Sequence, residues 1–341
     1  MISIFSLGFL LLTPLFLAAI VYKRPQFPFS WLIAASFAML SLIGLFASYN
    51  QISSKIQIIN WQTAGVLPYS PIFVVDEISW SYGLAVVTLL IAYLLYSPQQ
   101  YPDPAPETQT TAGKPWLAWG SPLIAGGLGL ATVLAGDLLA LIILWAALDV
   151  YELFLRLFSM GDANDINPIL ASFGVRTAGL ITIIWTMVGS GSSDFPTGID
   201  HTDYQFSTFL LGGAFLRIGV VPLKLPLTIA DNSLTRLGQL LRLIPAASAF
   251  MLLTRLSSLI EIQVNAVFFL CILLAAITGS ILWSFRQKRQ GSEPYWLLTA
   301  AVFLIITSIY ADASVSLSIG IGFLIAGGLF YFTSPTMKWL I

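Results

Sequence analysis

The sequence contains very few residues of the kinds that bind metals and redox cofactors. Of its 341 residues, one is a cysteine, Cys271, and one is a histidine, His201. A single cysteine excludes a disulfide framework, a CxxC redox pair and a cysteine-ligated iron–sulfur cluster. A single histidine excludes paired haem ligands and histidine-based metal sites. We therefore expect no cofactor, no metal and no catalytic residue in this chain, and we expect His201 to be a solvated loop residue.

Charge is also scarce. Charged residues make up 9% of the chain, hydrophobic residues make up 57%, and the net charge is −1. A typical soluble domain carries about 25% charged residues. The chain therefore has no basic surface for a nucleic acid, and its composition excludes a disordered chain and an ordinary soluble enzyme. Its mean hydropathy of +0.87 is typical of a polytopic membrane protein.

Long apolar runs predict an all-α membrane protein with about eleven transmembrane helices. A helix needs about 20 apolar residues to cross the hydrocarbon core of a bilayer. The predicted spans are 2–22, 28–48, 79–98, 116–135, 137–158, 168–190, 206–223, 236–256, 263–285, 295–311 and 313–334.

The distribution of Lys and Arg predicts the orientation of these spans, because loops on the inner side carry the excess of positive charge. The loops on the predicted outer side hold only Lys55 and Arg255. The pattern predicts an outside N-terminus and an inside C-terminus. The odd-numbered turns and the C-terminal tail hold Lys23, Arg24, Lys114, Arg156, Lys224, Arg236, Arg286, Lys288, Arg289 and Lys338.

Two polar segments interrupt the apolar runs. In the loop 49–78, polar and apolar residues alternate from Lys55 to Trp61, which predicts a β-hairpin or an interfacial loop at the outer surface. The segment 99–115 is polar and rich in proline, which predicts a flexible linker on the inner side. We expect a leading unit of three helices over residues 1–98, followed by this linker and the remaining helices.

Several ionisable residues fall inside predicted spans, where a charge is costly and is by default a functional hypothesis. Asp149, Glu152 and Arg156 are spaced by three and four residues, which places them on one face of a helix. They can form part of a proton relay or ion path, or they can form internal salt bridges that fix helix packing. Salt bridging is favoured for Glu152 with Arg156, and both interpretations stay open for Asp149 and for Arg217. The other candidates are Arg176, Arg217 and Arg242.

The span 206–223 ends in an unusual way. Pro222 and Pro226 remove backbone donors and break the helix, with Lys224 between them. Broken helices beside charged residues recur in transporters, where the irregular backbone lines a cavity. The alternative is a plain helix end at the inner surface. Lys288 is a further candidate for the ion path, although its basic neighbours favour an anchor at the inner surface.

Five stretches resemble a known family in order and spacing. The chain is similar to the antiporter-like membrane subunits of respiratory complex I, which are related to the large subunits of multisubunit Na+/H+ antiporters and membrane-bound hydrogenases. The resemblance covers roughly residues 70–300. The stretches that carry it are 75–84, 136–145, 213–223, 234–255 and Lys288-Arg289.

The chain departs from the family's pattern at the residues that the family uses for proton transfer. Ala146 stands where the family has a glutamate, Arg217 where it has a lysine, and Leu241 where it has a histidine. The resemblance implies that the Glu–Lys pair tunes a relay lysine. Arg217 could pair with Asp149, about one turn beyond Ala146, but an arginine is a poor proton carrier because it stays protonated.

The resemblance implies two inverted five-helix repeats after three leading helices. Here the first repeat would cover 116–258, and 259–341 would form a partial second repeat with the chain's last three helices. The implied function is that of a subunit in an energy-coupling membrane complex, of the NAD(P)H- or ferredoxin-quinone oxidoreductase type or the multisubunit cation/proton antiporter type. It would contribute to proton or cation translocation in a prokaryotic plasma membrane or a thylakoid-type membrane.

The partners implied are other membrane subunits and the lipid bilayer, with no nucleic acid, and the chain would not be an enzyme by itself. Two other functions stay open. One is a non-conducting structural subunit of such a complex. The other is an independent secondary carrier for an anion, which would bind at Arg176, Arg217 and Arg242.

Overall fold

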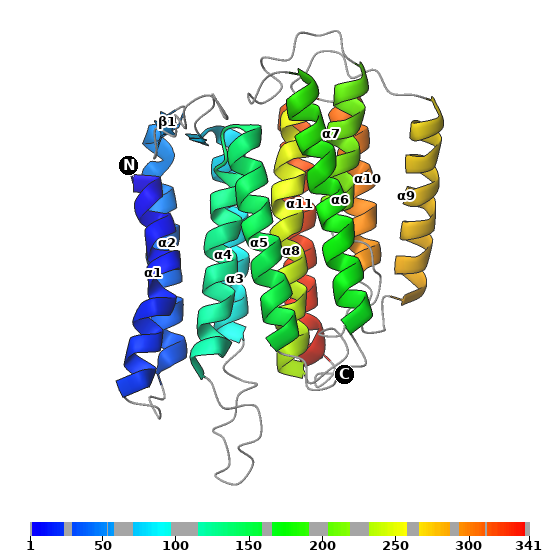
Figure 1. Ribbon diagram of the computed structural model, residues 1–341. Coiled ribbons are helices and arrows are strands. Elements are labelled where there is room, and N and C mark those ends of the chain that lie inside the picture. Colours follow the sequence, from blue (N-terminus) through cyan, green and yellow to red (C-terminus); the bar gives the residue numbers. More distant parts are fainter. Residues whose placement is uncertain are drawn as a thin grey trace.

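A computed structural model describes most of the chain. It covers residues 2–23, 29–52, 54–57, 71–96, 115–158, 166–190, 204–218, 232–257, 266–286, 293–310 and 312–337. The described residues form an all-helical bundle with one short β-hairpin (Figure 1).

Eleven α-helices account for nearly all of the described residues, as the hydropathy pattern predicts. Six of them, α2, α3, α5, α6, α8 and α11, are long and apolar enough to cross a membrane, and the others contain shorter apolar stretches. The helices are α1 (Ile2–Lys23), α2 (Ser30–Ala47), α3 (Glu77–Tyr96), α4 (Pro115–Val133), α5 (Leu138–Phe158), α6 (Ile166–Ser190), α7 (Tyr204–Arg217), α8 (Asn232–Leu256), α9 (Ala266–Arg286), α10 (Glu293–Tyr310) and α11 (Ala313–Met337).

Helix α7 is shorter than the predicted span 206–223. It ends at Arg217, and the backbone N–H of Ile218 donates to the carbonyl oxygen of Phe215 at 3.3 Å. A bond between residues three apart tightens the last turn of a helix and closes it. The structure therefore places Arg217 at the end of α7 rather than in the middle of a span. Residues 219–231, with the predicted break at Pro222 and Pro226, lie outside the described residues.

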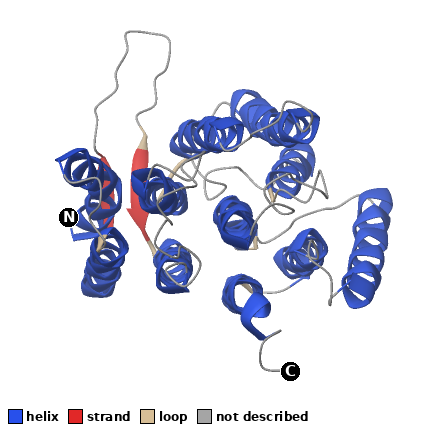
Figure 2. Ribbon diagram, turned by 90° about the horizontal axis from the view of Figure 1, so that it is seen from below, coloured by secondary structure: helices blue, strands red, loops and turns tan. Residues whose placement is uncertain are grey.

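The loop predicted over 49–78 contains a β-hairpin. A short 3-10 helix, η1 (Ser48–Gln51), leads into β1 (Ser54–Gln57), which pairs antiparallel with β2 (Ile72–Val75). Strand β2 is also bonded to the turn between α4 and α5, where the N–H of Gly136 donates to the oxygen of Ile72 at 2.7 Å. A Cβ at Gly136 would lie 2.4 Å from the side chain of Val74, so this close approach requires glycine. The hairpin thus closes one end of the bundle between the leading helices and α4 (Figure 2).

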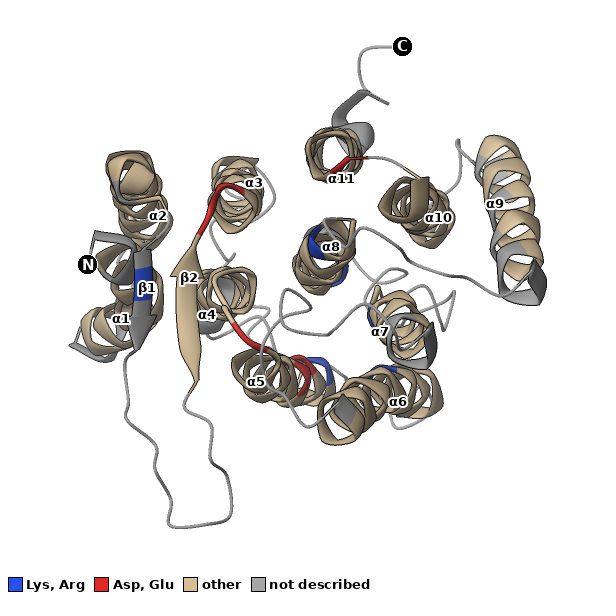
Figure 3. Ribbon diagram, turned by 90° about the horizontal axis from the view of Figure 1, so that it is seen from above, with Lys and Arg blue, Asp and Glu red and all other residues tan. Residues whose placement is uncertain are grey.

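Helix α8 lies at the centre of the bundle, with α3, α4, α7, α10 and α11 packed around it (Figure 3). Every residue of α8 from Leu237 to Leu256 is buried. Helix α9 stands at the edge and packs on α10 (Figures 1 and 3). Helix α1 begins and helix α11 ends at opposite ends of the bundle, which fits an odd number of spans (Figure 1).

The outer helices expose large apolar side chains. Phe5, Leu15 and Phe285 are 65%, 69% and 82% exposed, and Trp185 on α6 is 65% exposed. Apolar surface on this scale is unfavourable in water and is stable against lipid tails. The protein is therefore an integral membrane protein. Its orientation in the membrane, and its division into units at 1–98, 99–115, 116–258 and 259–341, stay predictions from the sequence.

Candidate functional site

Helix α5 carries three charged side chains into the interior of the bundle. Asp149, Glu152 and Arg156 lie on its buried face, as their spacing predicts, and their side chains are 3%, 4% and 1% exposed. The residues between them include Val150 and Phe154, which are 45% and 58% exposed. The helix therefore turns an apolar face outward and an ionised face inward.

Glu152 is held by two arginines. The Nε and Nη2 atoms of Arg156, one turn along α5, lie 2.7 and 2.5 Å from the same carboxylate oxygen, Oε1. The Nη1 atom of Arg176 on α6 donates to the other oxygen, Oε2. The pairing with Arg156 is the one that the sequence favoured. Both oxygens of Glu152 thus accept charge-assisted hydrogen bonds, which are the stronger kind.

Asp149 is held less completely. Its Oδ2 accepts a hydrogen bond from Nη1 of Arg217 on α7, while its Oδ1 lies 3.7 Å from Nη1 of Arg176. At 3.7 Å the second contact is an ion pair without a hydrogen bond. Asp149 therefore keeps one oxygen with no hydrogen-bond donor among the described residues.

Two further atoms of the Arg217 guanidinium group contact Trp145 on α5. Its Nη2 donates to the backbone carbonyl oxygen of Trp145 at 2.9 Å, and its Cζ lies 4.7 Å from the centre of the Trp145 ring. A guanidinium at this distance from an indole ring makes a cation–π contact. The Trp145 ring is itself fixed, because its Nε1 donates to Oγ of Ser248 on α8 at 2.8 Å.

Two glycines let α6 and α7 approach closely enough to bring these arginines together. A Cβ at Gly179 would lie 2.9 Å from the carbonyl oxygen of Gly213, and a Cβ at Gly213 would lie 2.5 Å from Oγ1 of Thr182. Small residues at a membrane helix interface allow such an approach. Because Arg176 lies on α6 and Arg217 on α7, this tight contact places both guanidinium groups against α5.

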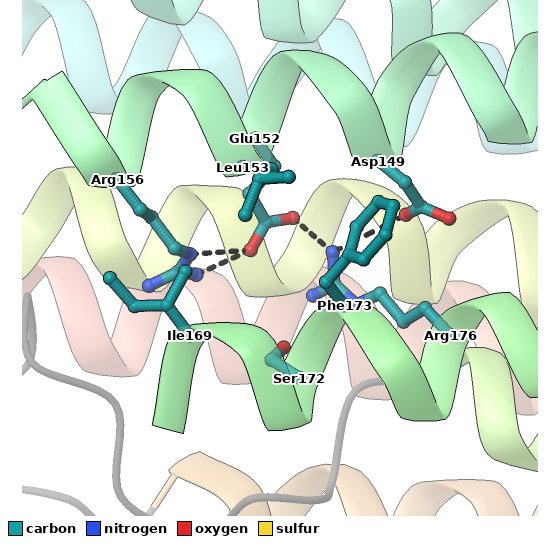
Figure 4. A pocket seen from close by; sticks show the side chains of 8 residues that line it. All are labelled: Asp149, Glu152, Leu153, Arg156, Ile169, Ser172, Phe173 and Arg176. Atoms are coloured by element: carbon teal, nitrogen blue, oxygen red, sulfur yellow. Dashed lines mark hydrogen bonds and ion pairs between the residues drawn. The ribbon is translucent and has the colours of Figure 1, made fainter. Parts of the chain in front are cut away.

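A small cavity lies between α5 and α6, beside Glu152 (Figure 4). The guanidinium groups of Arg156 and Arg176 reach toward Glu152 from opposite sides, and Ser172 on α6 lies between them. Leu153, Ile169 and Phe173 form the apolar part of the lining. Nothing in the sequence singles out Ser172 except its position one turn before Arg176.

The chemistry of this network is that of ions held apart from water. Arginine stays protonated, so the two carboxylates are the members of the network that can accept or release a proton. Within the described part of the chain, no group of three His, Cys, Asp or Glu side chains could hold a metal ion. The arrangement suits the handling of a proton or of a small ion rather than a reaction on an organic substrate.

The other candidate residues lie elsewhere. Arg242 is on α8 and is 1% exposed, which adds a guanidinium group to the buried core. Lys224 and Lys288, together with Pro222 and Pro226, fall outside the described residues.

A second buried ion pair lies at the hairpin end of the bundle. Arg255, near the end of α8, donates from Nη2 to Oδ2 of Asp76 at 3.0 Å and from Nη1 to the carbonyl oxygen of Ala135 at 2.8 Å. Asp76 precedes α3 and caps it, because its Oδ1 accepts the N–H of Ser79 at 2.7 Å. The pair thus joins α8, α3 and the turn between α4 and α5.

Comparison with solved structures identifies the fold of this chain. No protein-family model matches the sequence, and no curated protein matches it. Solved structures do match over nearly the whole chain. The chain has the antiporter-like membrane-subunit fold.

Three solved structures illustrate the match. A chain in the structure of the membrane-bound sulfane sulfur reductase, an archaeal respiratory membrane complex, aligns with 96% of this chain at a TM-score of 0.69 and 15% identity. A chain of the Mrp complex from Dietzia sp. DQ12-45-1b aligns with 97% at 0.70 and 15%. A chain of respiratory complex I from Thermus thermophilus with bound aureothin aligns with 96% at 0.67 and 14%.

These matches confirm the antiporter-like fold that the sequence motifs indicated. At 14–15% identity the likeness is one of fold. This chain also spans only part of each matched chain, namely 55% of the reductase chain, 36% of the Mrp chain and 69% of the complex I chain.

Proposed function

We propose that this protein is a membrane subunit of an energy-coupling complex and that its buried network takes part in proton or cation translocation. The observation that carries the proposal is the continuous chain of contacts Arg156–Glu152–Arg176–Asp149–Arg217 across three helices of the antiporter-like fold. Such a chain is expensive to bury in a membrane and is therefore a functional feature by default.

Asp149 is the carboxylate of this network that we assign to proton transfer. Glu152 has both oxygens bonded to arginines, whereas Asp149 keeps Oδ1 without a hydrogen-bond donor among the described residues. A carboxylate accepts a proton on an oxygen that is not already engaged by a donor. In this proposal Glu152 holds Arg156 and Arg176 in place, and Arg217 positions Asp149.

Similarity of fold supports a place in a larger complex. The three matched chains come from structures of multisubunit membrane complexes, and those structures are described as a sulfane sulfur reductase, an Mrp complex and respiratory complex I. The exposed apolar faces of the outer helices are compatible with lipid and with neighbouring membrane subunits.

A second candidate function is a non-conducting structural subunit of such a complex. It is favoured by Ala146 and Arg217, which stand where the resemblance places a glutamate and a lysine. Every charged member of the network then serves to hold α5, α6 and α7 together. The two functions predict different results for a change that removes the charge of Asp149 and leaves its shape.

The test is purification in mild detergent with identification of the partners, followed by measurement of proton pumping by the purified complex in vesicles. We expect partner membrane subunits to copurify. For the variant Asp149→Asn we expect pumping to fall by about a hundredfold or more while assembly stays intact, since a positioned proton-transfer group contributes on that scale. The variant Arg217→Ala should lower pumping as well, because it releases Asp149.

The matched control is Asp76→Asn, the same substitution at the other arginine-paired aspartate. It should leave pumping unchanged. If Asp149→Asn and Asp76→Asn assemble and pump alike, the buried network is structural and the second function stands. If the chain purifies without partners, membership of a complex is wrong and an independent carrier becomes the better account.

A further inference from the structure

The buried network holds more positive charge than its carboxylates neutralise. Three guanidinium groups, from Arg156, Arg176 and Arg217, share the two carboxylates of Asp149 and Glu152, and none of these side chains is more than 4% exposed. One positive charge is therefore in excess among these residues. An uncompensated buried charge is strongly unfavourable, so a structure with such an excess needs a counter-charge.

The excess is presented at the cavity between α5 and α6. Among the described residues, Nη1 of Arg156 and both Nε and Nη2 of Arg176 have no acceptor, although their side chains are 1% and 2% exposed. The nearest carboxylate, Glu152, already accepts donors from both arginines on its two oxygens. Buried donors without an acceptor are rare, and each of them calls for a partner.

The cavity is lined by hydrogen-bond donors from both helices. Ser172 lines it from α6, and a hydroxyl group donates to an anion as readily as to a neutral acceptor. Figure 4 shows Ser172 on the wall between the two guanidinium groups.

We propose that this cavity binds one small monovalent anion such as chloride. The Arg156 and Arg176 guanidinium groups and the Ser172 hydroxyl donate to it, and it neutralises the excess charge of the network. A cation is excluded by the sign of that excess. A neutral water would leave the charge uncompensated. The site is independent of the proposed function, because it requires no ion movement through the chain.

Thermal unfolding of the full purified protein tests this proposal. The unfolding midpoint is compared in sodium chloride, sodium bromide and sodium gluconate at matched ionic strength, since the three salts screen charges equally. A ligand that binds the folded state raises the midpoint progressively with the logarithm of its concentration. We expect such a rise in chloride and in bromide relative to gluconate. Binding of radiolabelled chloride gives a second, direct measurement.

Two variants locate the effect. Ser172→Ala should weaken the apparent chloride affinity by roughly tenfold, because it removes one hydrogen bond to a charged group. Arg156→Gln balances the network at two charges of each sign and should abolish the difference between chloride and gluconate. The control is Ser308→Ala, a buried serine on α10 whose hydroxyl donates within its own helix to Ile305. It should keep the full chloride effect.

The readout is the difference between salts, so a variant that is less stable overall still gives an answer. Equal midpoints in chloride and gluconate, with no bound radiolabelled chloride, would overturn the proposal. A chloride effect that persists unchanged in both Ser172→Ala and Arg156→Gln would also overturn it. Either result is separate from the pumping experiment, which depends on Asp149.

Discussion

At the hairpin end of the bundle, Arg255 meets one carboxylate and one backbone carbonyl, whereas in the middle of the bundle three arginines share two carboxylates. The first pair is balanced in charge, and the Asp76 side chain is 35% exposed, so water solvates part of it. The central network has an excess of positive charge, and each of its side chains is at most 4% exposed.

The difference separates two uses of buried charge. The pair at the hairpin end connects segments that are far apart in the sequence, and it matches one positive charge with one negative charge. The central network leaves donors of Arg156 and Arg176 and one oxygen of Asp149 without hydrogen-bond partners among the described residues. The first arrangement serves to fasten the fold, and the second has the capacity to bind or to pass an ion.

The largest effect on the free energy of unfolding is expected from removing the charge of Glu152, whose two oxygens both accept hydrogen bonds from arginines. Glu152→Gln leaves Arg156 without a counter-charge in the core and leaves Arg176 only its longer ion pair with Asp149. Breaking a buried pair in this way costs about 3–5 kcal/mol. The measurement is the free energy of unfolding from denaturant titration in mixed micelles. The control is Glu77→Gln at an exposed site in the first turn of α3. A cost no greater than that of the control would mean that Glu152 does not hold the network.

A smaller effect is expected from moving α6 away from α7. Gly179→Ala adds a Cβ that would lie 2.9 Å from the backbone oxygen of Gly213, and overpacking of this kind costs about 1–3 kcal/mol. Gly174→Ala is the matched control on the same helix, because its Cβ meets nothing within 4 Å. In helices this exchange stabilises by about 0.5–1 kcal/mol. The same titration should therefore give opposite signs for the two variants, and equal signs would argue against a tight α6–α7 contact.

The smallest effect is expected at the hairpin end. Asp76→Asn removes one charge from a partly exposed pair, while Arg255 keeps the carbonyl oxygen of Ala135 and an asparagine still caps α3. We expect a cost of about 1 kcal/mol, well below that of Glu152→Gln. If the two substitutions cost the same, the contrast between the two regions would fail.

The helices could be predicted from the sequence because each one needs a long apolar run, whatever its neighbours are. Ten of the eleven lie within four residues of their predicted bounds. The alternation that begins at Lys55 predicted a β-hairpin or an interfacial loop, and the structure contains the hairpin. The end of α7 at Arg217 was missed, since hydropathy continues past it and only the backbone bonding of Ile218 marks the end.

The site could be predicted only in part. The spacing of Asp149, Glu152 and Arg156 placed them on one face, and the pairing of Arg217 with Asp149 was among the possibilities. The bond from Arg176 to Glu152 could not be derived, because it depends on how α6 is rotated against α5. Ser172 carried no signal beyond its position one turn before Arg176, since a lone serine in an apolar helix usually bonds to its own backbone.

The complete enclosure of α8 bears on how the protein is made. This helix has the lowest mean hydropathy of the six clear spans and contains Arg242 and Arg255, yet every residue of its apolar window is buried in protein. An arginine near the middle of an isolated segment opposes insertion by the translocon by about 2.5–3.5 kcal/mol. Synthesis on the ribosome delivers α3, α4, α5 and α7 before α8, and α10 and α11 after it. We therefore expect the insertion of α8 to depend on the helices that are made before it.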